Sequence, residues 1–273
     1  MEVRKKVHEV KFKQLPTGVN LEYVEQGDPS GTPVLLLPGG YDSWRAYESV
    51  LPHLPESVRV FAISQRGHGD SSKPDTGYLF QHYADDAIAF LDAHNIDAAY
   101  FVGHSLSTMV AQRIAIDAPD RVRGIFLIGA GYSVANNPAM PEIRDNIIMK
   151  LEDPIDPDLV REFQEKAFGQ PLKDEQVDSL INEPLKIPAH IWKAVFEGMI
   201  KDDHSDSLHK IKAPVLLIWG DQDKMCDRSE QDSLKAAIPG AQLIIYEGLG
   251  HSPHWQVPDR LAIDLVNFVR NTG

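Results

Sequence analysis

Nearly continuous apolar runs that alternate with helix-like stretches constrain the fold of this chain more than any other feature. Runs without a polar face are typical of strands in a parallel sheet, because helices cover both sides of that sheet. The stretch from Phe80 to His94, between two of the runs, carries apolar residues at helical spacing. We therefore predict an α/β fold with a mostly parallel sheet flanked by helices. The runs are Pro33 to Leu37, Val58 to Ile63, Ala99 to Val102, Gly124 to Ile128, Val215 to Trp219 and Leu243 to Tyr246.

The beginning of the chain has a different pattern. Glu9 to Leu15 and Val19 to Glu25 alternate polar and apolar residues, and Pro16 and Gly18 lie between them. Alternation of period two on either side of a turn predicts an antiparallel hairpin. We place this hairpin at one edge of the sheet.

Residues 132–211 interrupt the alternation of strands and helices. Prolines punctuate this segment, and each is a natural helix boundary because proline lacks the amide donor. We predict a helical cap at 132–211, inserted into an α/β core of residues 1–131 and 212–273 and covering the carboxyl edge of the sheet, where ligands bind. The four helix-like stretches, none followed by a strand, are Glu142 to Leu151, Pro157 to Phe168, Lys173 to Ile181 and Ala189 to Ile200.

The charge of the chain disfavours several classes of partner. Asp and Glu number 40 against 27 for Lys and Arg, which gives a formal net charge of −13. We expect neither nucleic acid nor an anionic membrane as a partner of so acidic a chain. No apolar run approaches the length of a membrane span, and the first residues lack the apolar stretch of a signal peptide, so we expect a cytoplasmic protein. The single cysteine, Cys226, allows no intrachain disulfide, and the sequence leaves the oligomeric state open.

The most informative short stretch is Gly103-His-Ser-Leu-Ser107, where an apolar run breaks at a glycine and a helical pattern begins after Ser105. A serine at such a turn is held out of the sheet on a strained backbone, which only small residues two positions away allow. Ser105 is therefore the candidate nucleophile. The amides at the start of the following helix point outward, so the Leu106 amide can donate a hydrogen bond to an oxyanion.

A serine hydroxyl is a weak nucleophile and needs a base, together with a group that orients the base. Two later strand ends supply both. Gly220-Asp-Gln-Asp223 follows one apolar run, and Gly248-Leu-Gly-His251 follows the next. Because parallel strands end at the same edge, the acid and the histidine should lie near Ser105. The chain order of serine, acid and histidine is that of one hydrolase architecture.

On these motifs nearly the whole chain resembles the α/β-hydrolase superfamily, in particular its serine esterases and lipases with a helical cap. The resemblance implies an eight-stranded, mostly parallel sheet with the catalytic triad Ser105, Asp223 and His251. The family places the acid at the last position of its loop, so Asp223 is preferred to Asp221. The loop Gln65 to Ser71 resembles a family loop that braces the site. No cofactor and no metal is implied.

The resemblance also implies a second oxyanion donor, the backbone amide of Gly40, in the stretch Leu37-Pro-Gly-Gly40. Two positions depart from the family pattern. Pro38 stands where histidine is usual, although it leaves the amides of Gly39 and Gly40 available. Ser107 stands where the turn after the nucleophile usually has glycine.

The predicted activity is hydrolysis of a carboxylic ester or lactone of a small, largely apolar molecule through an acyl-enzyme. Alternatives are a carbon–carbon bond hydrolase on the same triad and a small-molecule receptor of the same fold that turns its ligand over slowly. The Ser107 motif also occurs in such receptors. Candidate pocket residues are Tyr41, Trp44, Trp192, Phe196 and His254.

Overall fold

The computed structural model describes residues 8–168 and 178–273 of the chain. Its sheet has eight strands in the order β1-β2-β4-β3-β5-β6-β7-β8. Strands β1 and β2 form an antiparallel hairpin that pairs with β4, and the remaining neighbours are parallel. The strands are β1 (Lys11–Gln14), β2 (Asn20–Gln26), β3 (Thr32–Leu37), β4 (Val58–Ile63), β5 (Ala99–His104), β6 (Val122–Ile128), β7 (Val215–Gly220) and β8 (Gln242–Tyr246).

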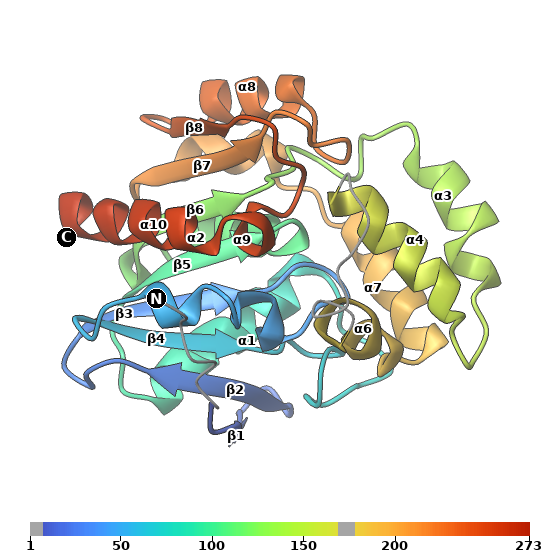
Figure 1. The fold of residues 1–273 in the computed structure, drawn as a ribbon, viewed down its shortest axis with the longest axis horizontal. Coiled ribbons are helices and arrows are strands. Elements are labelled where there is room, and N and C mark those ends of the chain that lie inside the picture. Colours follow the sequence, from blue (N-terminus) through green and yellow to red (C-terminus); the bar gives the residue numbers. More distant parts are fainter. Residues whose placement is uncertain (1–7, 169–177) are drawn as a thin grey trace.

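Helices cover both faces of the sheet (Figure 1). Two buried clusters, one on each side, account for the apolar runs. In β3, Leu35 and Leu37 belong to the cluster under α1 and α2, whereas Val34 and Leu36 belong to the cluster under α10. Successive side chains of a strand point to opposite faces, so both sets are buried only if both faces are covered. The core helices are α1 (Phe80–Ala93), α2 (Leu106–Asp117), α8 (Arg228–Ala237), α9 (Pro253–Gln256) and α10 (Pro258–Thr272).

The helices between β6 and β7 gather at one end of the molecule, toward which the arrows of β3 and β4 point (Figure 1). This is the carboxyl end of the parallel strands. The helices are α3 (Met140–Asn146), α4 (Pro157–Phe168), α6 (Glu183–Leu185) and α7 (Ala189–Lys201). Of the expected helix from Lys173 to Ile181, residues 173–177 lie outside the described residues. The division into core and cap at 131/132 and 211/212 stays a prediction.

The expected fold class is confirmed, including the edge hairpin and the parallel central strands. Among residues 8–168 and 178–273, no helix combines the length and apolarity needed to cross a bilayer.

Candidate active site

Ser105 lies between the end of β5 and the start of α2, on a strained backbone with φ 50° and ψ −118°. A positive φ is uncommon for a residue with a side chain and is found mostly where the surrounding structure enforces it. The turn is tight because β5 and α2 nearly touch. A Cβ atom on Gly103 would lie 2.3 Å from the carbonyl oxygen of Ser107. Glycine at 103 is therefore a steric requirement of the turn that exposes Ser105.

Asp223 and His251 come from different strand ends and form a buried hydrogen bond. Asp223 follows β7, His251 follows β8, and the His251 Nδ1 atom lies 2.7 Å from Asp223 Oδ2. The two side chains are 0% and 2% exposed, respectively. A carboxylate only accepts, so Nδ1 carries the proton and Nε2 holds the free lone pair. That Nε2 atom is buried and has no hydrogen-bond partner among the residues that the structure describes. His251 is thus oriented as a candidate base, with the lone pair of Nε2 available to accept a proton.

The backbone of His251 is fixed from two sides. Its amide donates to the carbonyl oxygen of Ala167 in α4 at 3.0 Å. Its own carbonyl accepts from Nε2 of His104 at 3.2 Å. His104 immediately precedes Ser105, and the rings of His104 and His251 are 5.0 Å apart. The neighbour of the candidate nucleophile therefore holds the candidate base in place.

Ser105 and His251 also contact the same short segment, Ile128 and Gly129 at the end of β6. The Ser105 amide donates to the carbonyl oxygen of Ile128 at 3.0 Å. The following Gly129 faces His251 so closely that a Cβ atom there would lie 2.8 Å from Nδ1. The structure thus brings all three predicted triad residues to one place at the carboxyl edge, and the Asp223–His251 pair is already hydrogen-bonded. Their catalytic roles stay predictions.

The two predicted oxyanion donors are neighbours. A Cβ atom on Gly40 would lie 3.4 Å from Leu106 Cδ1. The Leu106 amide opens α2, and the first amides of a helix have no acceptor inside the helix. Gly40 and Leu106, from distant parts of the chain, therefore lie in contact, and their roles as oxyanion donors stay predictions.

The two departures from the family pattern contact each other. The hydroxyl of Ser107 donates to the carbonyl oxygen of Pro38. The side-chain amide of Gln65 donates to Ser107 Oγ at 2.8 Å and reaches the Pro38 carbonyl at 3.4 Å. Sequence reasoning missed this network, although Gln65 follows the carboxyl end of β4 at the same sheet edge.

A further carboxyl group, Asp42, lies in the loop that carries Gly40, and sequence reasoning missed it. It is 6% exposed, and its carboxyl oxygen accepts a hydrogen bond from the side-chain amide of Gln164 in α4, at 3.4 Å. Burial raises the pKa of Asp42 to about 7, against a smaller lowering by that hydrogen bond and by the nearby His251. Close to neutral pH this carboxyl is therefore only partly ionised.

We expect the Asp42→Asn variant to gain stability relative to the wild type as pH rises. The folded-state pKa is above the unfolded value, so ionisation of Asp42 is costlier in the folded protein and folding stability falls between about pH 4 and pH 7. Linkage predicts a change of about 2–3 kcal/mol in favour of the variant between pH 5 and pH 8. Urea unfolding of both proteins at the two pH values measures it. An unchanged difference would contradict the buried, raised pKa.

The predicted pocket residues divide into two groups. Tyr41 stacks on Trp192 of α7 at 3.6 Å between ring centroids, and its hydroxyl donates to the Trp192 carbonyl oxygen at 3.3 Å. Phe196, also on α7, belongs to the same buried cluster. These residues join the loop of Gly40 to the helices above the site. As pocket residues they stay predictions.

Trp44 and His254 lie elsewhere. Trp44 belongs to the cluster on the α10 side of the sheet. His254 is fully buried, with its ring 4.3 Å from His104 and 5.5 Å from Tyr47. Burial lowers the pKa of His254 to about 3, so the ring is neutral at physiological pH. In this structure the His254 ring packs against the ring of His104.

One set of described side chains has the composition of a metal site. Ligand atoms of Asp223, Cys226 and His251 lie within 4.8 Å of one another. However, Asp223 Oδ2 binds His251, and Oδ1 accepts the amides of Met225 and Cys226 at 2.8 and 3.0 Å. Burial also raises the pKa of the Cys226 thiol well above its usual value, which disfavours the thiolate that metals bind. These contacts fit the acid–base pair of a catalytic triad better than they fit a metal site.

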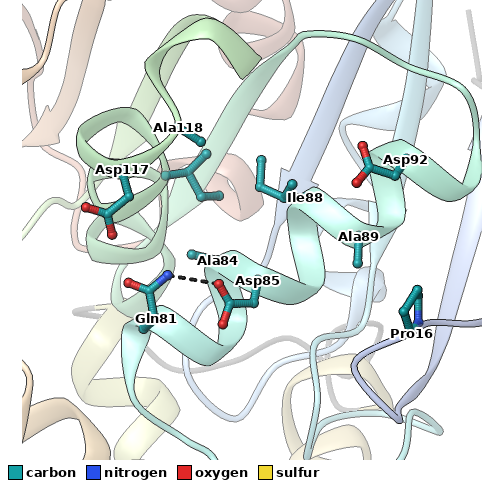
Figure 2. Close-up of a pocket in the computed structure, with 10 residues that line it drawn as sticks. Pro16, Gln81, Ala84, Asp85, Ile88, Ala89, Asp92, Asp117 and Ala118 are labelled. Carbon is teal, nitrogen blue, oxygen red and sulfur yellow. Dashed lines mark hydrogen bonds between the residues drawn. The ribbon is translucent and has the colours of Figure 1, made fainter.

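A hollow of about 390 Å³ lies between α1 and the end of α2 (Figure 2). Its polar lining includes Asp85, which accepts a hydrogen bond from Gln81 at 2.9 Å, together with Asp92 and Asp117. None of the predicted site residues lines it.

Comparisons with known proteins identify the family of the chain. Residues 34–265 match the model of the alpha/beta hydrolase family. The chain is 27% identical to the bifunctional esterase/perhydrolase of Acinetobacter calcoaceticus and to a non-heme chloroperoxidase of Streptomyces lividans, over 93% of this chain and 97% of each relative.

Among solved structures, a putative aryl esterase from Burkholderia cenocepacia superposes with a TM-score of 0.85 at 25% identity, covering 97% of this chain and 99% of the other. A hydrolase from Pseudomonas aeruginosa has the same fold, with a TM-score of 0.86 at 23% identity over 97% and 99% of the two chains. The chain therefore belongs to the alpha/beta hydrolase family.

Proposed function

We propose that this protein is a carboxylic ester hydrolase that works through an acyl-enzyme on Ser105. The observation that carries the proposal is the buried hydrogen bond of 2.7 Å between Asp223 and His251, which leaves the Nε2 lone pair of His251 free near the strained Ser105. Similarity to proteins named as esterases supports the ester as substrate.

In the first half of the reaction His251 Nε2 takes the proton of the Ser105 hydroxyl as its oxygen attacks the ester carbonyl carbon. The carbonyl oxygen becomes an oxyanion, which the amides of Gly40 and Leu106 stabilise. Asp223 stabilises the imidazolium that forms. Collapse of the tetrahedral intermediate returns the proton from His251 to the leaving alcohol and leaves an ester on Ser105.

In the second half His251 takes a proton from a water molecule, which attacks the acyl-enzyme at the same carbonyl. The same two amides stabilise the second oxyanion. Collapse releases the carboxylic acid and returns the proton to Ser105. Burial of Asp223 and His251 strengthens these electrostatic interactions, because little water screens them.

Pre-steady-state kinetics with p-nitrophenyl acetate test the proposal. An acyl-enzyme predicts a burst of about one equivalent of p-nitrophenol per site, followed by steady turnover. A panel of esters and lactones of graded size should then yield many cycles on at least one member. A single slow cycle with a large rise in thermal stability would instead support the receptor. Turnover of a vinylogous diketone but no ester would support the carbon–carbon bond hydrolase.

A further inference from the structure

The two proposed oxyanion donors belong to segments that are far apart in the sequence. Gly40 lies in the loop after β3, and Leu106 opens α2. An oxyanion hole works only if both amides are fixed at the correct separation before the reaction, because donors that must reorganise stabilise the transition state less. The chain therefore needs a contact that holds the loop and the helix together.

The Ser107 hydroxyl supplies such a contact. It donates to the carbonyl oxygen of Pro38, and Ser107 and Pro38 lie one and two residues from the respective donor amides. Gln65, just after β4, donates to the Ser107 hydroxyl at 2.8 Å and approaches the Pro38 carbonyl at 3.4 Å. Three segments that end at the carboxyl edge are thus joined at one point.

The position of this network favours a tight linkage. Ser107 is 0% exposed and Gln65 is 3% exposed. Hydrogen bonds in such an environment are electrostatically stronger than in water. Proline also restricts the backbone at 38, since its ring fixes φ near −65°. The carbonyl that receives the bonds is therefore on a stiff part of the loop.

Stability alone is a weak reason for this network. Replacing both partners of a buried hydrogen bond by apolar groups of the same shape can be nearly neutral, so an apolar contact at this point would hold the fold about as well. Polar groups kept where an apolar contact would serve are expected at functional positions.

We infer that Ser107 and Gln65 are positioning residues that fix the separation of the Gly40 and Leu106 amides. This inference rests on the proposed ester hydrolysis. Ser107 and Pro38 stand where the family usually has glycine and histidine. Because the Ser107 hydroxyl donates to the Pro38 carbonyl oxygen, these two departures form one structural unit.

The Ser107→Ala variant keeps the Cβ atom and removes only the hydroxyl. We expect kcat per titrated site to fall about 10- to 100-fold, the size of effect that a small misplacement causes. KM should change by less than about threefold, because the bond matters chiefly in the transition state. We expect kcat per titrated site to fall by a similar factor in Gln65→Ala. In the double variant kcat should be only slightly lower than in the more impaired single variant, since both side chains act through one network.

Two further measurements separate positioning from stability. A trifluoromethyl ketone forms a tetrahedral adduct whose oxyanion occupies the hole, so its inhibition constant should rise by the same factor as kcat/KM falls. The matched control is Tyr100→Phe, which removes a buried hydroxyl that donates to the Val269 carbonyl at 3.2 Å, on α10. This control should lower the melting temperature while kcat per titrated site and ketone inhibition stay as in the wild type.

The inference is wrong if Ser107→Ala and Gln65→Ala keep wild-type kcat per titrated site and wild-type ketone inhibition. It is also wrong if their losses simply multiply in the double variant. Failure of the proposed function looks different, because the wild type itself would then show neither a p-nitrophenol burst nor inhibition by the ketone.

Discussion

Replacing Ser105 by alanine is expected to lower kcat for ester hydrolysis by about 10⁵- to 10⁶-fold, the loss seen when the nucleophile of a serine triad is removed. The residue has this effect because the acyl-enzyme cannot form without its oxygen. The fold should remain, since alanine preserves the backbone hydrogen bonds of Ser105, from its amide to the Ile128 carbonyl and from Thr108 to its own carbonyl.

The measurement compares steady-state turnover and thermal unfolding of both proteins. Turnover near the wild-type level in a folded Ser105→Ala protein would contradict the assignment. Loss of turnover together with loss of the folded state would call for Ser105→Cys, which keeps a nucleophile at the turn and should still be acylated.

Replacing Asp223 by asparagine is expected to lower kcat about 10³- to 10⁴-fold. An amide at this position presents an N–H or an uncharged oxygen to His251 Nδ1. It therefore stabilises the imidazolium poorly and allows the wrong tautomer. The size of the effect follows from burial, because the 2.7 Å bond is screened by almost no solvent.

The matched control for Asp223 is Asp221→Asn, in the same loop. Asp221 is exposed, and its carboxylate accepts the amide of Gly248 at 2.7 Å, away from His251. We expect this variant to keep kcat within about threefold, as is usual for a surface change. Equal losses at 221 and 223, measured as kcat with a p-nitrophenyl ester, would show that the loop, and not the carboxylate of Asp223, is what matters.

The fold could be predicted from the sequence because the period and the length of each apolar pattern indicate which faces of an element are buried. The runs before Gly103 and Gly220 are fully buried strands, whereas the run before Gly248 is a half-exposed edge strand. A parallel sheet brings the ends of all three to one edge whatever the details of packing. The proximity of Ser105, Asp223 and His251 could therefore be predicted from three separate motifs.

Contacts that depend on side-chain direction could not be predicted. No periodicity indicates that the Ser107 hydroxyl reaches Pro38, or that His104 holds the carbonyl of His251. Trp44 and Trp192 have similar chemistry in the sequence, yet the structure places them in different buried clusters. Trp44 lies on the α10 side of the sheet, and Trp192 lies on α7, above its carboxyl edge. Asp42 gave no signal because an acid in a loop is ordinarily exposed.

The most direct test of the central claim is covalent labelling with a fluorophosphonate, followed by peptide mass spectrometry. The reagent reacts with a serine only where a base activates it and an oxyanion hole receives the phosphoryl oxygen. We predict one adduct per chain, on Ser105, and loss of labelling in Asp223→Asn in proportion to its loss of turnover. An adduct on another residue, or no adduct on folded wild-type protein, would contradict the assignment of Ser105 as the nucleophile.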